Sequence, residues 1–186
     1  MKRILTALLA LSINAGCSDA FETNSPRSWE LDQANEEAEA DEDPARRFDR
    51  DEFEAEVIML VNERRGESIM CGIEARGPSA PFSMDRVLRR AARHHSHDLR
   101  RRNVISHESA DGGRFWDRAV AFDGVARGEA VAGGHPSPEH VVEAWIESPG
   151  HCLVLLLPEA THVGVGYEFD GKTRFGHFWT LVVGTR

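Results

Sequence analysis

The stretch that decides the fold is residues 162–184, HVGVGYEFDGKTRFGHFWTLVVG. It holds two runs rich in apolar and β-branched residues, at 162–169 and 175–184, on either side of Asp170-Gly171-Lys172. Turn residues between two strand-like runs favour a β-hairpin. The sequence therefore predicts two adjacent antiparallel strands near the C-terminal end of the chain.

Helical patterns lie upstream of this hairpin. Residues 51–65, DEFEAEVIMLVNERR, carry apolar side chains at helical spacing, and Ser83 is placed to cap a long helix after them. Residues 114–124 fit a short amphipathic helix, and Ser137-Pro138 is a typical helix start. Helices followed by an antiparallel sheet predict an α+β fold rather than a parallel α/β fold.

Composition and charge limit the function classes. The chain has 186 residues, 41% hydrophobic and 28% charged, so a core can form in one domain. Its formal net charge of −9 makes a nucleic-acid partner a poor fit. Arginines at 89, 90, 93 and 100–102 crowd one predicted helix, and a solvated face explains them better than an anion site.

The N-terminus has the pattern of an export signal. Lys2 and Arg3 precede the apolar run 4–13, which is too short to span a bilayer of about 30 Å. Ala15-Gly16-Cys17 then resembles the lipidation site of bacterial lipoproteins, although Asn14 departs from that motif. We expect a signal peptide at 1–16 and a protein exported to the bacterial cell envelope. Lipid anchoring at Cys17 and secretion after ordinary cleavage are both compatible with the pattern.

An acidic stretch separates this signal from the domain. Residues 18–50 carry 11 acidic and 4 basic side chains, with few large apolar residues. Such a segment cannot bury enough surface to order itself. The sequence predicts a disordered segment over 17–50, either a tether that holds the domain off a membrane or a solvated tail, and a folded domain over 51–186.

The remaining cysteines form an even pair in an exported chain. An oxidising compartment favours a disulfide between Cys71 and Cys152, and two separate buried thiols are the alternative. A zinc site built on them is a poor fit, because neither cysteine has a partner at metal-ligand spacing.

Seven motifs in order resemble one known family. Their sequences are Leu88-x-x-Ala91-Ala92-x-x-His95-Ser96-x-Asp98-Leu99, Asn103-Val104-Ile105-Ser106-His107, Asp111-Gly112, Gly128-Glu129, Ser137-Pro138-x-x-Val141-Val142-x-x-Trp145, Ser148-Pro149-Gly150-His151 and Gly164-Val165-Gly166. Over about residues 52–184 the chain resembles the CAP superfamily of cysteine-rich secretory, antigen 5 and pathogenesis-related proteins, and within it the bacterial SCP-domain proteins. The resemblance implies a three-layer α-β-α sandwich with a central antiparallel sheet.

The resemblance also implies a cavity lined by two histidines and two acidic residues. His107 and His151 match the histidines, and Glu129 matches the first glutamate, although Ala130 replaces the asparagine of the family's Gly-Glu-Asn motif. Ser148 stands where the second glutamate usually lies. The neighbouring Glu147 is the candidate substitute, although its position on an opposite helix face counts against it.

Three kinds of chemistry remain open for these residues. His107 and His151 could bind zinc or another divalent cation, or could do acid–base work together with Glu129. They could equally form a buried structural network. The sequence shows no activated nucleophile, so whether the protein is an enzyme stays undecided. We expect a binding module for a lipid or cell-envelope ligand, with a metal-dependent hydrolase or protease as the alternative; the oligomeric state is not determined.

Other histidines have weaker claims. His94, His95 and His97 do not converge on a helix, so we expect them at the surface or at a groove edge. His177 alternates with Phe175 and Trp179 on its predicted strand and fits a core or interface position.

Overall fold

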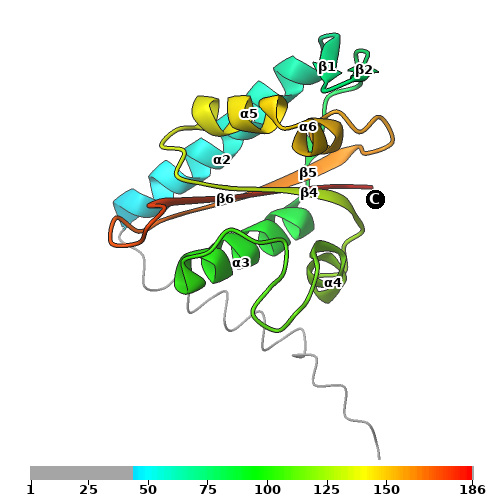
Figure 1. Cartoon of the computed structure of the whole chain (residues 1–186). Helices are drawn as coiled ribbons and strands as arrows, with labels where there is room; N and C mark the ends of the chain where they lie inside the picture. The colour runs from blue at the N-terminus through cyan, green and yellow to red at the C-terminus, as the bar shows by residue number, and fades with distance from the viewer. Residues whose placement is uncertain (1–43, 186) are drawn as a thin grey trace, which may run out of the picture.

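The structure, a computed structural model, describes residues 44–185, with side chains from residue 50 onward. The elements are α2 (Pro44–Arg65), β1 (Ile69–Cys71), β2 (Glu74–Arg76), β3 (Ser83–Met84), α3 (Arg86–Arg102), α4 (Phe115–Ala121), β4 (Ala126–Gly133), α5 (Pro138–Glu147), α6 (Pro149–Leu155), β5 (His162–Phe169) and β6 (His177–Gly184). The main sheet has the strand order β3-β5-β6-β4. Helices α2, α5 and α6 cover one face of it, and α3 and α4 cover the other (Figure 1). The expected α-β-α sandwich is confirmed.

The C-terminal hairpin is the centre of the sheet. β5 and β6 pair antiparallel from His162 opposite Gly184 to Phe169 opposite His177. β3 adds a short parallel pair to β5, so the sheet is not antiparallel throughout. Ser83, expected to cap α3, lies in β3 instead, and Asp85 is the cap, accepting hydrogen bonds from the first-turn backbone N–H groups.

Strand β4 is an element that the sequence patterns did not reveal. It runs antiparallel to β6 at the edge of the sheet and carries Glu129 near its middle. Its sequence, ARGEAVAG, contains one β-branched residue and two glycines, so it lacks a strand signature. Pairing with β6, rather than local preference, makes this segment a strand.

Close backbone contact joins α3 to β5. A Cβ atom on Gly164 would lie 2.1 Å from the backbone of Leu88 and Arg89, and one on Gly166 would lie 2.4 Å from that of Ala92. Only glycine permits this approach, which explains the Gly-Val-Gly motif. Between the layers, the hydroxyl of Ser96 donates a hydrogen bond to the Gly166 carbonyl at 2.9 Å.

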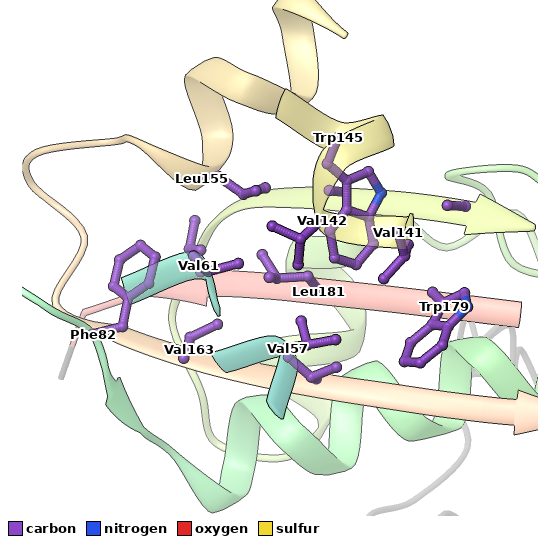
Figure 2. Packing of buried hydrophobic residues seen from close by; sticks show 14 of the residues in the cluster. Val57, Val61, Phe82, Val141, Val142, Trp145, Leu155, Val163, Trp179 and Leu181 are labelled. Carbon is purple, nitrogen blue, oxygen red and sulfur yellow. The ribbon is translucent and has the colours of Figure 1, made fainter. Parts of the chain in front are cut away.

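The main apolar core lies on the opposite face of the sheet. Figure 2 shows α2 and α5 contributing to it together with the strands. Val57 and Val61 are fully buried there, as the predicted helical face of residues 51–65 requires. Trp145 of α5 and Leu181 of β6 are also buried, so one cluster joins the helical layer to the sheet.

The disulfide between Cys71 and Cys152 is present, with a Cα–Cα distance of 5.4 Å. It ties α6 to the β1–β2 hairpin. The hairpin turn also packs on the start of α6, because the Cβ position of Gly72 lies 3.1 Å from the Pro149 ring. Two contacts therefore fix the first turn of α6.

The N-terminal boundary differs from the prediction. α2 begins at Pro44, so residues 44–50 of the expected disordered segment are helical. Proline suits the first helical position, and the alanine and arginines after it are good helix formers. The predicted signal peptide and Cys17 lie outside the described residues. Among the helices that the structure does describe, none is long and apolar enough to cross a membrane.

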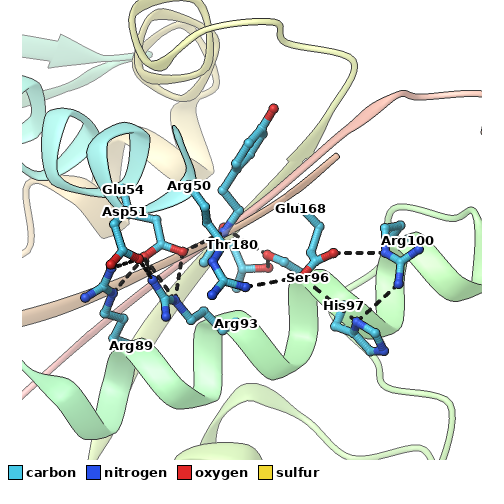
Figure 3. A network of polar contacts seen from close by, with 12 residues as sticks. Arg50, Asp51, Glu54, Arg89, Arg93, Ser96, His97, Arg100, Glu168 and Thr180 are labelled. Atoms are coloured by element: carbon cyan, nitrogen blue, oxygen red, sulfur yellow. Dashed lines mark hydrogen bonds and ion pairs between the residues drawn. The ribbon is translucent and has the colours of Figure 1, made fainter. Parts of the chain in front are cut away.

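Three arginines of α3, Arg89, Arg93 and Arg100, form ion pairs with acidic groups, as Figure 3 shows. Arg89 and Arg93 both contact Asp51 and Glu54 of α2, and Glu54 is 1% exposed. Arg100 pairs with Glu168 of β5 at 2.9 Å. The pairs of Arg89 and Arg93 fasten α2 to α3, and the pair of Arg100 ties α3 to β5. Carboxylates on the protein therefore already occupy these three arginines, which does not favour an anion site here.

Candidate functional site

His107 and Glu129 meet at the edge of the sheet. His107 lies in the connection between α3 and α4, and Glu129 projects from β4. The ring Nδ1 of His107 lies 2.9 Å from Glu129 Oε1. The side chain of Glu129 is fully buried, whereas that of His107 is 46% exposed. The pair therefore presents a solvent-accessible imidazole on a buried carboxylate.

Arg118 of α4 completes the anchoring of this pair. Its guanidinium group is almost fully buried and contacts Glu129 Oε2. The same group donates to Ser109 Oγ at 2.7 Å and to the Gly113 carbonyl at 3.1 Å, which holds the connection that carries His107. Sequence reasoning missed Arg118, because an arginine in a short amphipathic helix is ordinarily a surface residue and no spacing rule connects it to Glu129.

His151 faces this arrangement from the first turn of α6. Its ring centroid lies 6.0 Å from that of His107, with the ring planes at 51°. Burial, and next the neighbouring His107, hold the pKa of His151 below its ordinary value. The structure thus brings His107, Glu129 and His151 together from a loop, a strand and a helix.

The fourth position of the family cavity holds no carboxylate. Ser148 forms the junction between α5 and α6, and its backbone carbonyl accepts a hydrogen bond from Cys152 N at 2.8 Å. Glu147 is exposed, which does not support its role as a substitute. The position that matches the second acid is therefore a serine at the junction of two helices.

The ligand atoms available to a metal ion are limited. Both oxygens of Glu129 are engaged, one by His107 and one by Arg118. The atoms that remain are Nε2 of His107, whose Nδ1 is engaged by Glu129, and the ring nitrogens of His151. The two ring centroids lie 6.0 Å apart, which is short enough for one shared ion. Within residues 50–185, no group of three or more histidine, cysteine or acidic side chains is arranged to hold a metal.

The other histidines lie away from this pair or have structural partners. His95 is completely buried, and its Nε2 lies 2.8 Å from the Ser106 carbonyl, so the expected surface position is wrong for it. The apolar face of α3 turns this residue inward. His177 lies 2.9 Å from the Tyr167 hydroxyl on the adjacent strand, as a core or interface histidine would.

A separate groove of about 340 Å³ runs between α2 and α5. Leu60 and Val142 provide its apolar part, and His140 lines it beside charged side chains. None of its lining residues belongs to the His107–Glu129–His151 group. It is therefore a second concave surface, separate from the histidine pair.

Comparison with known proteins identifies relatives of the chain. The profile described as the cysteine-rich secretory protein family, CAP, matches residues 58–183. The Bacillus subtilis protein YkwD is 34% identical over 123 residues, which are 64% of this chain and 44% of that protein. The B. subtilis membrane protein YlbC is 33% identical over 117 residues, 62% of this chain and 31% of that protein. The chain thus spans less than half the length of these two relatives.

Solved structures share the fold at lower identity. An extracellular SCP-domain protein from Bacillus anthracis has a TM-score of 0.57 at 20% identity, covering 73% of this chain and 41% of that one. An outer surface protein from Borrelia burgdorferi has a TM-score of 0.54 at 20% identity, covering 69% of this chain and 89% of that one. These likenesses concern architecture alone.

Proposed function

From the premise that the chain belongs to the cysteine-rich secretory protein family, CAP, we propose that it is an exported binding module that captures a lipid or cell-envelope ligand at the His107–His151 pair. The observation that carries the proposal is a half-exposed imidazole seated on a buried, ion-paired carboxylate opposite a second imidazole. A purely structural network would have no need to leave His107 open to solvent.

Anchoring of the pair supports a binding role. His107 is fixed through Glu129 and Arg118, and His151 sits in a helical turn held by the Cys71–Cys152 disulfide. Binding sites gain affinity when their polar groups are positioned before the ligand arrives, because less conformational freedom is then lost. Both imidazoles meet this condition.

A hydrolase is the second candidate, and the His107–Glu129 hydrogen bond favours it, because a carboxylate commonly orients a catalytic histidine. The neighbouring residues offer no activated nucleophile. The Ser106 hydroxyl accepts a hydrogen bond from Glu108 N at 3.0 Å, and Cys152 is in the disulfide. Hydrolysis would therefore need a water activated between His107 and His151, with or without a divalent cation.

The proposed location is the outer side of a bacterial membrane. Two structural relatives, an extracellular protein and an outer surface protein, support export. We propose that Cys17 is acylated and that the acidic segment after it holds the domain away from the lipid surface. Net negative charge suits such a spacer near anionic lipids, because it repels the surface rather than adhering to it.

The test compares binding by single-histidine variants. The purified mature protein is mixed with vesicles of envelope lipid extract and, separately, with sedimentable cell-wall material, and the bound fraction is measured by co-sedimentation. His107→Ala and His151→Ala should each reduce binding about tenfold, the effect of losing one positioned hydrogen bond. His140→Ala is the matched control, because His140 is exposed and lines only the α2–α5 groove.

Each outcome has a defined meaning. Loss of binding in His140→Ala alone would show that the ligand binds in the α2–α5 groove and would refute the proposed site. Equal binding by all three variants would refute it as well. Loss of wild-type binding on adding a chelator, with recovery on adding zinc, would make a divalent cation part of the site. Release of a cleaved product by wild type, but not by His107→Ala, would favour the hydrolase.

A further inference from the structure

Each oxygen of the Glu129 carboxylate has its own partner. On one side Oε1 faces His107 Nδ1 at 2.9 Å, and on the other Oε2 contacts the guanidinium group of Arg118. Both Glu129 and Arg118 are almost fully buried, so water does not screen the contact between their charges. An arginine in this position is permanently charged, and it forms an ion pair with the Glu129 carboxylate.

The ionised state of Glu129 decides where the proton of the neutral His107 ring lies. A carboxylate can only accept a hydrogen bond, so the hydrogen in the 2.9 Å contact belongs to His107 Nδ1. In the neutral ring the other nitrogen, Nε2, then carries a lone pair and no hydrogen. His107 therefore meets a ligand as a hydrogen-bond acceptor.

We infer that Arg118 is a positioning residue that fixes His107 in the Nδ1–H tautomer and so selects ligands that donate a hydrogen bond, such as a hydroxyl or ammonium group, over ligands that only accept one. The inference rests on the proposed function, because it specifies which chemistry the His107–His151 pair recognises. Among envelope components, the polyhydroxyl groups of glycans and glycolipid headgroups have this chemistry, whereas a fatty-acid carboxylate lacks it.

The surroundings of His107 are consistent with this selectivity. The nearest ring, His151, has a pKa held below the ordinary value by burial, so it is neutral at pH 7 and adds no positive charge that would attract an anion. Arg118 itself is inaccessible, since its side chain is 5% exposed and its charge is directed at Glu129. The site thus presents a lone pair and no free cation from these residues.

The first experiment reads the tautomer directly. Long-range ¹H–¹⁵N spectra of the mature protein, at a pH where His107 is neutral, distinguish a protonated from an unprotonated ring nitrogen. The wild type should show Nδ1 protonated and Nε2 unprotonated. Arg118→Gln should shift His107 toward the opposite tautomer, because the buried Glu129 then takes up a proton and donates it to Nδ1. Arg118→Lys, which keeps the charge, should restore the wild-type spectrum.

Ser109→Ala is the matched control. It removes one bond between Arg118 and the loop but leaves the contact with Glu129 intact, so the tautomer should not change. A purely structural role for Arg118 predicts the reverse pattern, with melting temperature affected in both variants and the tautomer in neither. A wild-type spectrum with Nε2 protonated would overturn the inference even if Arg118→Gln fails to fold.

The second experiment tests selection with two small probes. Methyl glucoside offers hydroxyl donors, and acetate only accepts hydrogen bonds. Methyl glucoside should shift the His107 Nε2 signal, and this binding should weaken about tenfold in Arg118→Gln and not in His140→Ala, which changes only the α2–α5 groove. Binding of acetate in preference to the glucoside would overturn the inference. If neither probe binds and the spectra show the expected tautomers, selection of hydroxyl donors is overturned while the positioning role of Arg118 stands, and the co-sedimentation test decides the proposed function separately.

Discussion

Arg65 holds three separate segments together at the C-terminal end of α2. Its buried guanidinium group donates hydrogen bonds to the carbonyls of Ala80 and Leu155 at 2.8 Å and to that of Leu157 at 3.2 Å. It also lies 3.6 Å from the centroid of the Phe82 ring. Burial lowers the pKa of Arg65 to about 10, which still leaves it charged at neutral pH.

Replacing Arg65 should be costly even when the charge is kept. Arg65→Lys should lower the free energy of unfolding by about 2–3 kcal/mol, because a lysine cannot supply the same fork of donors and leaves buried carbonyls unpaired. The adjacent Arg64→Lys is the control, since Arg64 is 41% exposed and pairs only at the surface, and it should change stability by less than about 0.5 kcal/mol. Urea denaturation of both variants measures the difference, and equal losses of stability would contradict this role of Arg65.

His95 should make the domain sensitive to mild acid. Burial lowers the pKa of His95 to about 4, whereas an unfolded histidine titrates near 6.5. The unfolded chain therefore binds the proton first as the pH falls. Stability is fully present above about pH 6.5 and should decline toward pH 4, by up to about 3 kcal/mol from this residue.

The corresponding variant is His95→Gln, which keeps a side-chain donor for the Ser106 carbonyl but does not titrate. Its free energy of unfolding should vary less with pH between 6.5 and 4 than that of wild type. His140→Gln, at an exposed position, should leave the wild-type slope unchanged. Parallel slopes for wild type and His95→Gln would show that another group controls the acid response; burial likewise lowers the pKa of His97 to about 4.

At the scale of elements, the contact between α3 and β5 determines how tightly the two layers close. The glycines of β5 allow the helix backbone to rest on the strand, and Ala92 of α3 is fully buried at this contact. The same helix carries His95, whose bond to Ser106 fixes the start of the connection leading to His107. Packing of α3 therefore positions one wall of the candidate site.

Adding one methyl group at Gly166 should separate these layers. Gly166→Ala would place a Cβ atom 2.4 Å from the Ala92 backbone, and neither backbone can move without breaking its own hydrogen bonds. We expect a loss of about 3 kcal/mol or more of stability, in the upper range for overpacking. Gly77→Ala is the control, because no atom lies within 4 Å of the new Cβ position. Thermal melting that shows equal losses would refute the close contact.

At the scale of the whole molecule, the site is assembled from both layers and the sheet between them. α4 on one face provides Arg118, β4 provides Glu129, and α6 on the other face provides His151 (Figure 1). The Cys71–Cys152 disulfide holds α6. The ion pairs between α2 and α3 join the helical layers on either side of the sheet (Figure 3). A change in any layer is therefore expected to reach the histidine pair.

The proposed attachment to a membrane depends on Cys17, near the N-terminus. If Cys17 is acylated, the protein should partition with the membrane fraction into detergent, and Cys17→Ala should convert it to a soluble or uncleaved form. Ser18→Ala is a control that leaves the cysteine in place and should not release the protein. Intact-mass measurement checks the same point, because a free N-terminus at any residue other than Cys17 would exclude the anchor.

The sequence by itself determined the features that depend on local patterns. The hairpin of β5 and β6, the start of α5 at Ser137-Pro138 and the helical face of Val57 and Val61 follow from alternation, capping and periodicity. The Cys71–Cys152 bond followed from pairing in an exported chain. The resemblance to the CAP family directed attention to His107, Glu129 and His151 before their geometry was known.

Only the tertiary structure decided the features that depend on distant partners. β4 is a strand because β6 pairs with it, Ser83 joins β3 because β5 lies beside it, and His95 is buried because the sheet covers its helix face. Arg118 resembles a surface arginine until α4 places it against Glu129. Periodicity and capping describe a segment and its near neighbours in sequence, whereas the orientation of His107 depends on Glu129 and Arg118, two charges that the fold brings together from a strand and a helix.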